Sequence, residues 1–401
     1  MFIGLYVLSL FFFIYLNNRK EIFSYPPGKI EPVSIVMPCY NESAHIGRAI
    51  ESLLELNYPM DKLEIIVVDD QSKDNSTDIV RSYARKYRNV RLIINKRNSG
   101  GAAEPTNIGV RAAKYDYIAV ADADSFPEKD ALLKMIGFLQ NDLTVGGVTC
   151  AVLSKRPETF MQKLQALEYT VIAFNRKLLD FVDSVYVTPG PFALYRKKVL
   201  LEIGLFDVKN MTQDIEIVWR MLSKGYKARM CLGAHVYTAT PIKFKQWWKQ
   251  RVRWNIGGTQ TMTKYRSLVF RNGMLGNFII PFFSVSLFIG LFGLILFCYL
   301  MTRRLGLWYL SAKYSLAANT TLLTMQDLSF VPSVLNFFGG ALFILGIAFT
   351  LLALTIIKQR EFKNKNIFNL MFYLIIYLAV YPFIMITGLT KLLTGRYSWG
   401  K

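Results

Sequence analysis

Three long runs of apolar residues constrain this chain more than any other feature of its sequence. They cover residues 274–301, 331–357 and 367–390, and none of them contains a charged side chain. Each is longer than the ~20 apolar residues that an α-helix needs to cross the ~30 Å hydrocarbon core of a bilayer. A buried helix of a soluble core rarely runs this long without a charge. The runs therefore predict a helical membrane region at residues 271–401.

A shorter apolar stretch at residues 2–16 is followed, not preceded, by Arg19 and Lys20. A cleavable signal peptide has the opposite charge order and a small-residue cleavage site. The stretch therefore favours an uncleaved transmembrane anchor over residues 1–18. The positive-inside rule then puts residues 18–272 on the cytosolic side of a multi-pass protein of the cell membrane.

The charges between the apolar runs do not all agree with this orientation. The basic loop at 358–366 belongs on the cytosolic side if three helices span the membrane. Arg303, Arg304 and the basic C-terminus then fall on the outside. One of the runs is therefore a candidate for a surface or re-entrant helix.

The 401 residues carry a formal net charge of +20, which suits nucleic acid, anionic lipid or an anionic substrate as a partner. The sequence has no RNA- or DNA-binding motif, so nucleic acid is not expected, and membrane lipids with a negative surface explain the charge. The four cysteines have no paired spacing, which argues against a disulfide framework and a zinc site. With only two histidines, the chemistry must depend on carboxylates, metal ions or cations. The oligomeric state is left open.

Residues 31–240 alternate the patterns of buried strands and amphipathic helices. The segments "VSIVMPCYNE" (33–42), "LEIIVVDDQS" (63–72) and "DYIAVADADS" (116–125) are apolar runs that end in polar residues. "STDIVRSYARKY" (76–87) predicts a helix opened by a Ser/Thr cap. This alternation predicts an α/β domain with a mostly parallel sheet covered on both faces. A dinucleotide-binding fold is disfavoured because no Gly-x-Gly-x-x-Gly follows the first strand.

Polar residues that end these strands should gather at one edge of the sheet, where ligands of such sheets bind. They are Tyr40, Asn41, Glu42, Asp69, Asp70, Asp122 and Asp124. Asp122 and Asp124 lie one residue apart and can approach one Mg²⁺ or Mn²⁺ ion, whose ligands substrate phosphates usually complete. Asp70 can accept hydrogen bonds from a base or ribose, and Tyr40 can stack on the base. Helix capping or solvation of a strand end is the alternative for Asp69 and Asp70.

Six motifs follow one another along residues 33–260. They are "VSIVMPCYNE", "IIVVDDQSKDNS", "VADADS", "TPGPFALYRKKVLLEIGLFD", "TQDIEIVWRMLSKGY" and "QRVRW". In this order they resemble the family 2 glycosyltransferases, and within these the membrane-embedded synthases of poly-β-1,6-N-acetylglucosamine, with hyaluronan and cellulose synthases more distant. The resemblance implies a GT-A fold, a nucleoside-diphosphate sugar donor, commonly a UDP-sugar, and inversion at the anomeric carbon.

The resemblance also implies roles for residues on the donor side. Asp70 matches the residue that contacts the nucleotide base. Asp122 and Asp124 match the pair that contacts the ribose and holds the metal ion on the diphosphate. Tyr40 and Glu42, at the end of the first strand, complete the expected donor site.

The general base of the family deprotonates the acceptor hydroxyl, and Asp214 of "TQD" (212–214) takes its place. A carboxylate opposite the leaving group can serve in this role. Gln213 stands where relatives have Glu, which removes one charge beside the base. Glu216 is a weaker candidate, and a helix N-cap is the structural alternative for Asp214.

The stretch "KQWWKQRVRW" (245–254) combines three of the six tryptophans with four cations just before the first apolar run. An amphipathic helix of this composition suits a lipid interface, which by itself would explain Trp247 and Trp248. Residues 241–270 are therefore expected to form interface helices.

The resemblance implies a second role for this stretch, as the Gln-x-x-Arg-Trp motif over the active site. Gln250 and Arg253 then lie on the donor side, because a guanidinium matches phosphate geometry. Trp254 would stack under the acceptor sugar. Gly190 and Pro191, in "VTPGPFALYR", form a rigid turn that is expected either in the acceptor pocket or as a purely structural turn.

These observations predict a membrane-integrated inverting glycosyltransferase with a cytosolic GT-A domain. It would transfer a sugar, best assigned as N-acetylglucosamine, from a UDP-sugar to a growing glycan, with Mg²⁺ or Mn²⁺ as cofactor. One alternative is the transfer of a single sugar to a lipid-linked acceptor, a polyprenyl phosphate or a glycolipid. A non-catalytic membrane scaffold is the other, but it predicts loss of acids that this chain retains.

Overall fold

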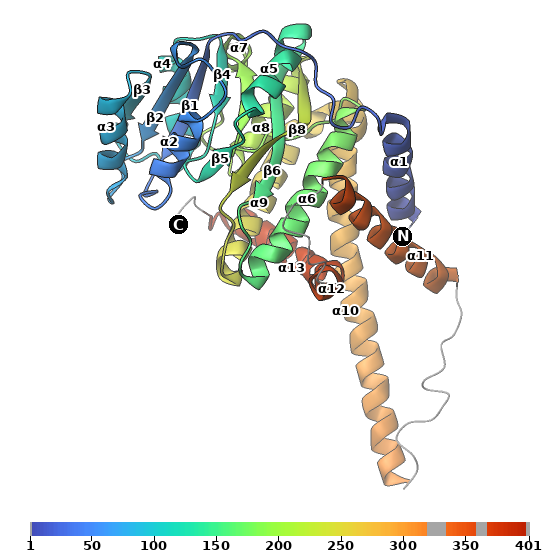
Figure 1. The fold of residues 1–401 in the computed structure, drawn as a ribbon. Coiled ribbons are helices and arrows are strands. Elements are labelled where there is room, and N and C mark those ends of the chain that lie inside the picture. The colour runs from blue at the N-terminus through green and yellow to red at the C-terminus, as the bar shows by residue number, and fades with distance from the viewer. Residues whose placement is uncertain (1, 319–333, 358–366, 398–401) are drawn as a thin grey trace.

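The computed structural model describes residues 2–318, 334–357 and 367–397, and an eight-stranded sheet forms the centre of its soluble part (Figure 1). The strand order is β3-β2-β1-β4-β7-β6-β8-β5. The strands are β1 (Val33–Cys39), β2 (Leu63–Asp69), β3 (Val90–Ile94), β4 (Tyr117–Val120), β5 (Ser125–Pro127), β6 (Val145–Ser154), β7 (Ala193–Arg196) and β8 (Lys227–Thr238). Strands β1 to β4 are parallel and β6 is parallel to β8, whereas β7 and β5 run antiparallel to their neighbours. The predicted mostly parallel α/β sheet is confirmed.

Helices cover both faces of the sheet. One face carries α2 (Ile46–Leu54), α3 (Ser76–Lys86) and α5 (Ala131–Asn141), and the other carries α4 (Ala103–Ala112), α6 (Phe160–Asp180), α7 (Lys197–Glu202) and α8 (Gln213–Ser223). Side chains of β1 alternate between the two cores, since Ile35 and Met37 belong to the first and Val36 to the second. The strands are therefore apolar throughout, because both of their faces are buried.

The start of α3 differs from the prediction of a Ser/Thr cap. The helix begins at Ser76 itself, and Asn75 precedes it without a side-chain cap. The Ser76 hydroxyl donates to Asp74 and accepts a hydrogen bond of 2.8 Å from the backbone N–H of Glu42. A tertiary contact to the end of β1 thus replaces the local cap, and it fixes the backbone of Glu42.

The N-terminal helix α1 (Phe2–Asn18) packs beside α11 (Val334–Ile356) and α6 (Figure 1). The ring centroids of Phe11 and Phe349 are 6.2 Å apart, and those of Tyr15 and Phe174 are 5.8 Å apart. Residues 19–32 then cross the outside of the soluble domain to reach β1. This packing ties the apolar N-terminal helix to both the sheet domain and the C-terminal apolar helices.

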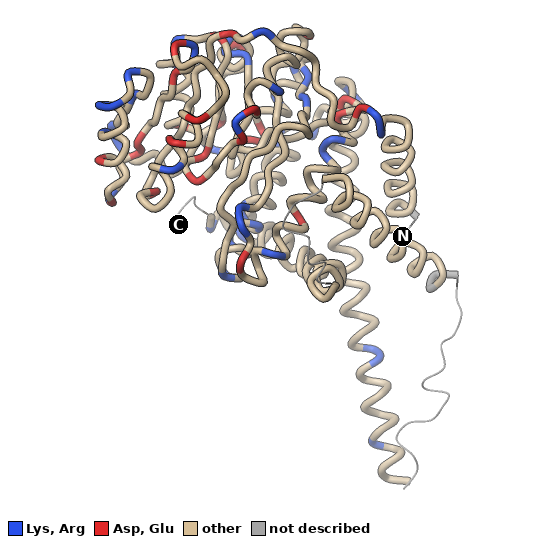
Figure 2. The backbone as a smooth tube through the Cα atoms, in the orientation of Figure 1, with Lys and Arg blue, Asp and Glu red and all other residues tan. Residues whose placement is uncertain are grey.

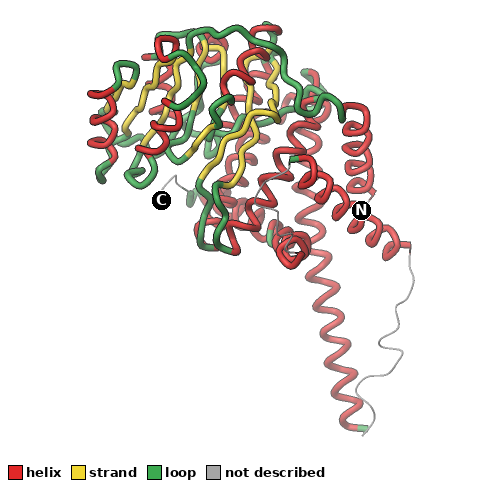
Figure 3. Tube along the Cα trace, in the orientation of Figure 1, coloured by secondary structure: helices red, strands yellow, loops and turns green. Residues whose placement is uncertain are grey.

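Two helices are long and apolar enough to cross a membrane, Leu275–Ala317 and Phe337–Ile356. The first joins a π-helical turn (Leu275–Ile279) to α10 (Ile280–Ala317), which extends away from the sheet (Figure 3). Charged residues are spread over the soluble domain but are few along α10 (Figure 2). The basic loop predicted on the cytosolic side, 358–366, lies outside the described residues.

The third apolar run forms a bent pair of helices. Ile367–Tyr377, made of α12 (Ile367–Phe372) and a π-helical turn (Tyr373–Tyr377), meets α13 (Tyr381–Thr394) at an angle of 42°. The pair counts as a third candidate span only if both helices form one broken span; otherwise it is re-entrant. This geometry agrees with the expectation that one run departs from a simple span.

Candidate active site

The candidate site lies where β1, β2 and β4 end at the same edge of the sheet. The backbone N–H of Asp70 donates to the carbonyl of Cys39 over 2.8 Å, and that of Ala121 donates to Val36 over 3.0 Å. The residues that follow these three strands are therefore held side by side. The structure therefore places Tyr40, Glu42, Asp70, Asp122 and Asp124 at one edge of the sheet.

Asp122 and Asp124 form the acidic centre of this edge. Burial, together with the nearby carboxylates of Asp124 and Asp214, raises the pKa of Asp122 to about 8, and Arg253 opposes this rise. Burial also raises the pKa of Asp124, followed by the repulsion of Glu42. Four acids from β1, β4 and α8 therefore share one electrostatic environment.

Asp214 lies in the first turn of α8, which follows Thr212. Burial raises the pKa of the Asp214 carboxyl, and the positive charges of Arg253 and Arg176 work against that rise. Its Oδ1 accepts a hydrogen bond of 3.1 Å from the N–H of Ile215. The half-buried carboxylate thus keeps a raised pKa in spite of the two nearby cations, so it can take up a proton at a higher pH than an exposed aspartate can.

Arg253 and Trp254 belong to the long helix α9 (Phe244–Tyr265), which passes directly over the start of α8. Arg253 Nη1 donates to the carbonyl of Met211 over 3.3 Å. A Cβ on Gly257 would lie 2.2 Å from Thr212 Oγ1, so only glycine allows the two helices to approach this closely. The Gln-x-x-Arg-Trp helix and the "TQD" turn are therefore one packed unit.

The turn that contains Gly190 and Pro191 borders the same site. A Cβ on Gly190 would lie 2.8 Å from both carboxylate oxygens of Asp122. The N–H of Thr188 donates to the backbone carbonyl of Asp214 over 3.3 Å. The turn therefore lies between Asp122 and Asp214, and Gly190 leaves room for the carboxylate.

Asp70 forms a second, separate part of the site. Its buried carboxylate accepts hydrogen bonds from Asn95 Nδ2 (2.7 Å), from the N–H of Ser99 (2.9 Å) and from Ser99 Oγ (2.8 Å). A carboxylate offers about four lone-pair positions, so it retains capacity for a ligand. Sequence reasoning missed Asn95 and Ser99, which follow β3; their place after a strand end was the available signal.

The residues of the acidic centre fit a divalent cation that arrives with a diphosphate. Within residues 2–318, 334–357 and 367–397, no group of three His, Cys, Asp or Glu side chains forms a complete metal site. Asp122 and Asp124 nevertheless provide two hard oxygen donors, whose pKa is raised first by burial and then by neighbouring carboxylates. Mg²⁺ commonly binds one or two carboxylates and takes its other ligands from water and phosphates.

Glu216, the weaker candidate for the base, is committed elsewhere. It is fully buried, pairs with Arg220 and with Lys264 (2.7 Å), and accepts a hydrogen bond of 2.9 Å from Tyr265. The Glu216 carboxylate is thus occupied by two cations and a hydroxyl. Among the two acids of this helix, Asp214 is the one next to the acidic centre.

Trp247 faces the protein interior, whereas an amphipathic interface helix would turn this ring outward. Its side chain is fully buried, its ring centroid is 4.8 Å from that of Tyr377, and its indole N–H donates to the Tyr377 hydroxyl. The reason is tertiary, because the third apolar run folds back over α9. Trp254 is half-buried and packs against the core on the sheet face of α2 and α5.

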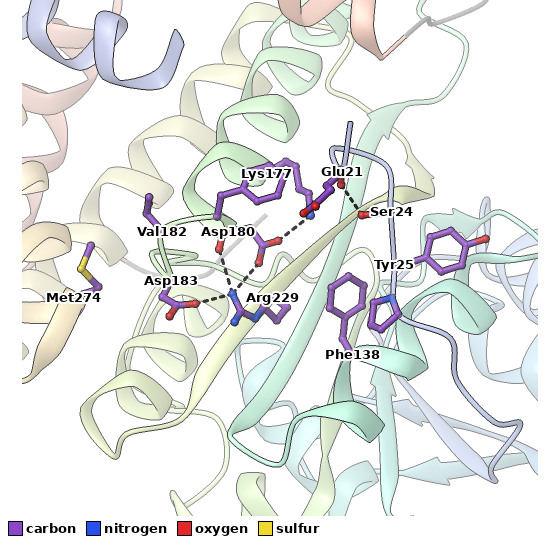
Figure 4. Close-up of a pocket in the computed structure, with 12 residues that line it drawn as sticks. Glu21, Ser24, Tyr25, Phe138, Lys177, Asp180, Val182, Asp183, Arg229 and Met274 are labelled. Carbon is purple, nitrogen blue, oxygen red and sulfur yellow. Dashed lines mark hydrogen bonds and ion pairs between the residues drawn. The ribbon is translucent and has the colours of Figure 1, made fainter. Parts of the chain in front are cut away.

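A cavity of about 870 Å³ lies away from these residues, between residues 21–26, α5, the end of α6 and β8 (Figure 4). Four of its five charged side chains pair with one another, Lys177 with Asp180 (2.9 Å) and Arg229 with Asp183 (2.6 Å), and the fifth is Glu21. None of the predicted site residues lines it. The cavity thus lies at the contact between the N-terminal segment and the sheet domain.

The sheet, the acids at its carboxyl edge and the helix that covers them define a glycosyltransferase with a GT-A-like fold. The chain belongs to the glycosyltransferase family 2: the model described as "Glycosyltransferase like family 2" matches residues 30–257, more than half of the chain.

Relatives and solved structures agree with this assignment. The chain is 29% identical over 250 residues to a poly-β-1,6-N-acetyl-D-glucosamine synthase of Staphylococcus aureus (strain COL), covering 62% of this chain and 59% of that enzyme. It is 27% identical over 286 residues to the same-named enzyme of Staphylococcus epidermidis, covering 71% and 68%. The mannosyltransferase PcManGT from Pyrobaculum calidifontis, solved with GDP-Man and Mn²⁺, has a similar fold, with a TM-score of 0.57, 18% identity, and coverage of 97% and 96%.

Proposed function

We propose that this chain is a membrane-bound inverting transferase that moves N-acetylglucosamine from UDP-N-acetylglucosamine to a growing polysaccharide. The observation that carries the proposal is the convergence of Asp122, Asp124, Asp214 and Arg253 on one buried site. The names of the staphylococcal relatives support the sugar and the polymer. The match spans 59% of the length of the Staphylococcus aureus enzyme, so the activity of that whole enzyme is part of the proposal.

The donor would lie across the carboxyl edge of the sheet. Asp70 accepts a hydrogen bond from the base with its remaining lone pair, and Tyr40 stacks on the base. Asp122 contacts the ribose, and Glu42 faces Asp122 and Asp124 from the end of β1. This order follows the strands from β2 through β1 to β4.

In the reaction, an acceptor hydroxyl oxygen attacks the anomeric carbon while the bond from that carbon to UDP breaks. Asp214 takes the hydroxyl proton as general base, and a single displacement inverts the configuration. The guanidinium of Arg253 interacts electrostatically with both Asp214 and Asp122, and it stabilises the departing diphosphate. Asp122 and Asp124 would hold Mg²⁺ or Mn²⁺, which would supply further neutralisation of the diphosphate.

The acceptor would enter from the side of α9. Trp254 offers a flat ring for the apolar face of a sugar, and Gln250 lies one turn before it on the same helix. Gly190 and Pro191 form the opposite wall, against Asp122. By the positive-inside rule, the site faces the cytosol in a multi-pass membrane protein.

The direct test is turnover by the purified full chain with Mn²⁺, with UDP-N-acetylglucosamine and GDP-mannose as alternative donors. GDP-mannose is included because PcManGT was solved with GDP-Man. We expect metal-dependent UDP release and a ladder of glycan products. Release of GDP alone would contradict the proposed donor.

Transfer of a single sugar to a lipid acceptor is the second candidate function. It is favoured by the apolar helix pair that packs directly on α9, because this places a membrane helix beside the acceptor side of the site. One added sugar on a lipid-extractable product would select it over the polymer. The non-catalytic scaffold would be supported only by the absence of hydrolysis and transfer with every nucleotide sugar tested.

A further inference from the structure

A buried ion pair joins α6 to α9 outside the reacting centre. Glu168 and Arg251 are 3% and 2% exposed, which is rare for charged side chains. Arg251 Nε donates to Glu168 Oε1 over 3.2 Å, and Arg251 Nη2 donates to Glu168 Oε2. Two parallel hydrogen bonds of this kind fix orientation as well as charge.

Two tyrosines attach the bent helix pair to the same carboxylate. Tyr377 donates to Glu168 Oε2 over 2.6 Å, and Tyr381 donates to Glu168 Oε1. Tyr377 is the last residue before the break in the pair, and Tyr381 is the first residue after it. Glu168 therefore holds both arms of the bend at once.

Arg251 connects this cluster to two residues of the Gln-x-x-Arg-Trp motif. Its Nη1 donates to Gln250 Oε1 over 2.6 Å, and its guanidinium carbon lies 4.0 Å from the ring centroid of Trp254. A cation over the face of an indole is attracted to the ring and restrains it. One side chain thus contacts the carboxylate, the amide and the indole.

Close packing continues along the same two helices. A Cβ on Gly388 of α13 would lie 2.3 Å from Asn255 Oδ1, so α13 contacts α9 one residue beyond Trp254. Trp247 contacts Tyr377 at the other end of the cluster. The bent pair is therefore held against α9 on both sides of the motif.

We propose that Glu168, Tyr377 and Tyr381 are positioning residues, which act through Arg251 to hold Trp254 in place for the acceptor and so couple the bent helix pair to acceptor binding. This inference rests on the proposed function. A buried ion pair contributes little net stability compared with apolar residues of the same size, so stability alone does not explain it. The contacts of Arg251 to Gln250 and Trp254 explain why a buried ion pair is placed here.

The test separates acceptor from donor in the full chain purified in detergent. Donor binding is measured by calorimetry with UDP and Mn²⁺, and acceptor binding with a β-1,6-linked tetrasaccharide of N-acetylglucosamine. In Glu168→Gln we expect acceptor KM to rise by about tenfold, because displacements near 1 Å cost up to about 100-fold, and UDP affinity to stay within about twofold. Tyr377→Phe combined with Tyr381→Phe should change the same two quantities in the same direction.

Two further variants separate positioning from stability. Tyr373→Phe is the matched control, since Tyr373 is a buried tyrosine one turn before Tyr377 whose ring packs on that of Tyr377 but whose hydroxyl does not bond to Glu168. Phenylalanine keeps the ring, so the acceptor KM of this variant should equal that of the wild type. The combination Glu168→Leu with Arg251→Met removes both charges and should melt near the wild-type temperature. We expect its acceptor KM to stay raised, because the contact to Trp254 is gone.

The inference would be overturned if the acceptor KM of Glu168→Leu combined with Arg251→Met equalled that of the wild type. It would also be overturned if Glu168→Gln lost affinity for UDP and for the acceptor equally. The proposed function fails separately, if the wild-type chain itself neither binds the tetrasaccharide nor releases UDP from UDP-N-acetylglucosamine. Wild-type turnover with unaffected variants would overturn the positioning role alone.

Discussion

Replacing Gly190 by alanine adds one methyl group directly against Asp122. The new Cβ would lie 2.8 Å from both carboxylate oxygens, about 0.6 Å short of the 3.4 Å at which ordinary contact begins. The backbone of Gly190 is outside the left-handed region, so alanine adopts it without strain. The methyl group therefore acts first on Asp122, which supplies its three nearest heavy atoms.

The size of the effect follows from how far the carboxylate must move. Metal–ligand distances hold within about 0.2 Å, so a displacement of about 0.6 Å is incompatible with the original coordination. Turning the side chain off its rotamer costs about 0.5–1.5 kcal/mol, which corresponds to at most about tenfold in metal affinity. Misplacement at the reacting centre can add a loss of up to about 100-fold in transfer.

The assay is UDP release as a function of Mn²⁺ concentration in Gly190→Ala. Gly258→Ala is the matched control, because a Cβ there meets no heavy atom within 4 Å among the described residues, and alanine favours the helix. We expect a higher Mn²⁺ requirement and slower transfer in Gly190→Ala alone. Wild-type Mn²⁺ dependence and rate in Gly190→Ala would refute the placement of this turn against the metal-binding acid.

Other substitutions and pH test the remaining parts of the site. Gly257→Ala puts a Cβ 2.2 Å from Thr212 Oγ1, so α9 must move away from α8. The transfer rate should then fall by about 100-fold, and UDP binding is measured in the same variant. A wild-type transfer rate would contradict the close approach of α9 to α8. Asp70→Asn should weaken UDP binding by about tenfold and leave the rate at saturating donor nearly unchanged, which titration calorimetry and initial rates distinguish. Burial raises the pKa of Asp214, and Asp214 stops acting as a base once it takes up a proton. On acidification kcat/KM should therefore begin to fall at a pH above about 3.9, the ordinary pKa of an aspartate. A value of kcat/KM that stays flat down to that pH would argue against Asp214 as the base.

The sheet and its acidic edge were predictable because their signals are local. Apolar runs that end in Asp70 or in Asp122 and Asp124 fix both the strand and the position of its carboxylates. Parallel strands that share one edge then bring these residues together without further information. The structure confirms this part of the prediction.

Contacts between distant segments were not predictable in the same way. Trp247 was expected at a lipid interface because its local sequence is amphipathic, but Tyr377, 130 residues further on, buries it. Glu168 looked like an ordinary helix residue, since its partners lie on α9 and on the third apolar run. A single charge within the largely apolar segment 164–174 was the only signal it gave.

The central claim is that one set of acids binds the donor diphosphate while Asp214 alone removes the acceptor proton. The most direct measurement is UDP affinity and transfer rate in Asp214→Asn, in the presence of Mn²⁺ and UDP-N-acetylglucosamine. We predict nearly unchanged UDP affinity and no detectable transfer. Parallel loss of both would make Asp214 a donor ligand, and transfer at the wild-type rate would contradict the account.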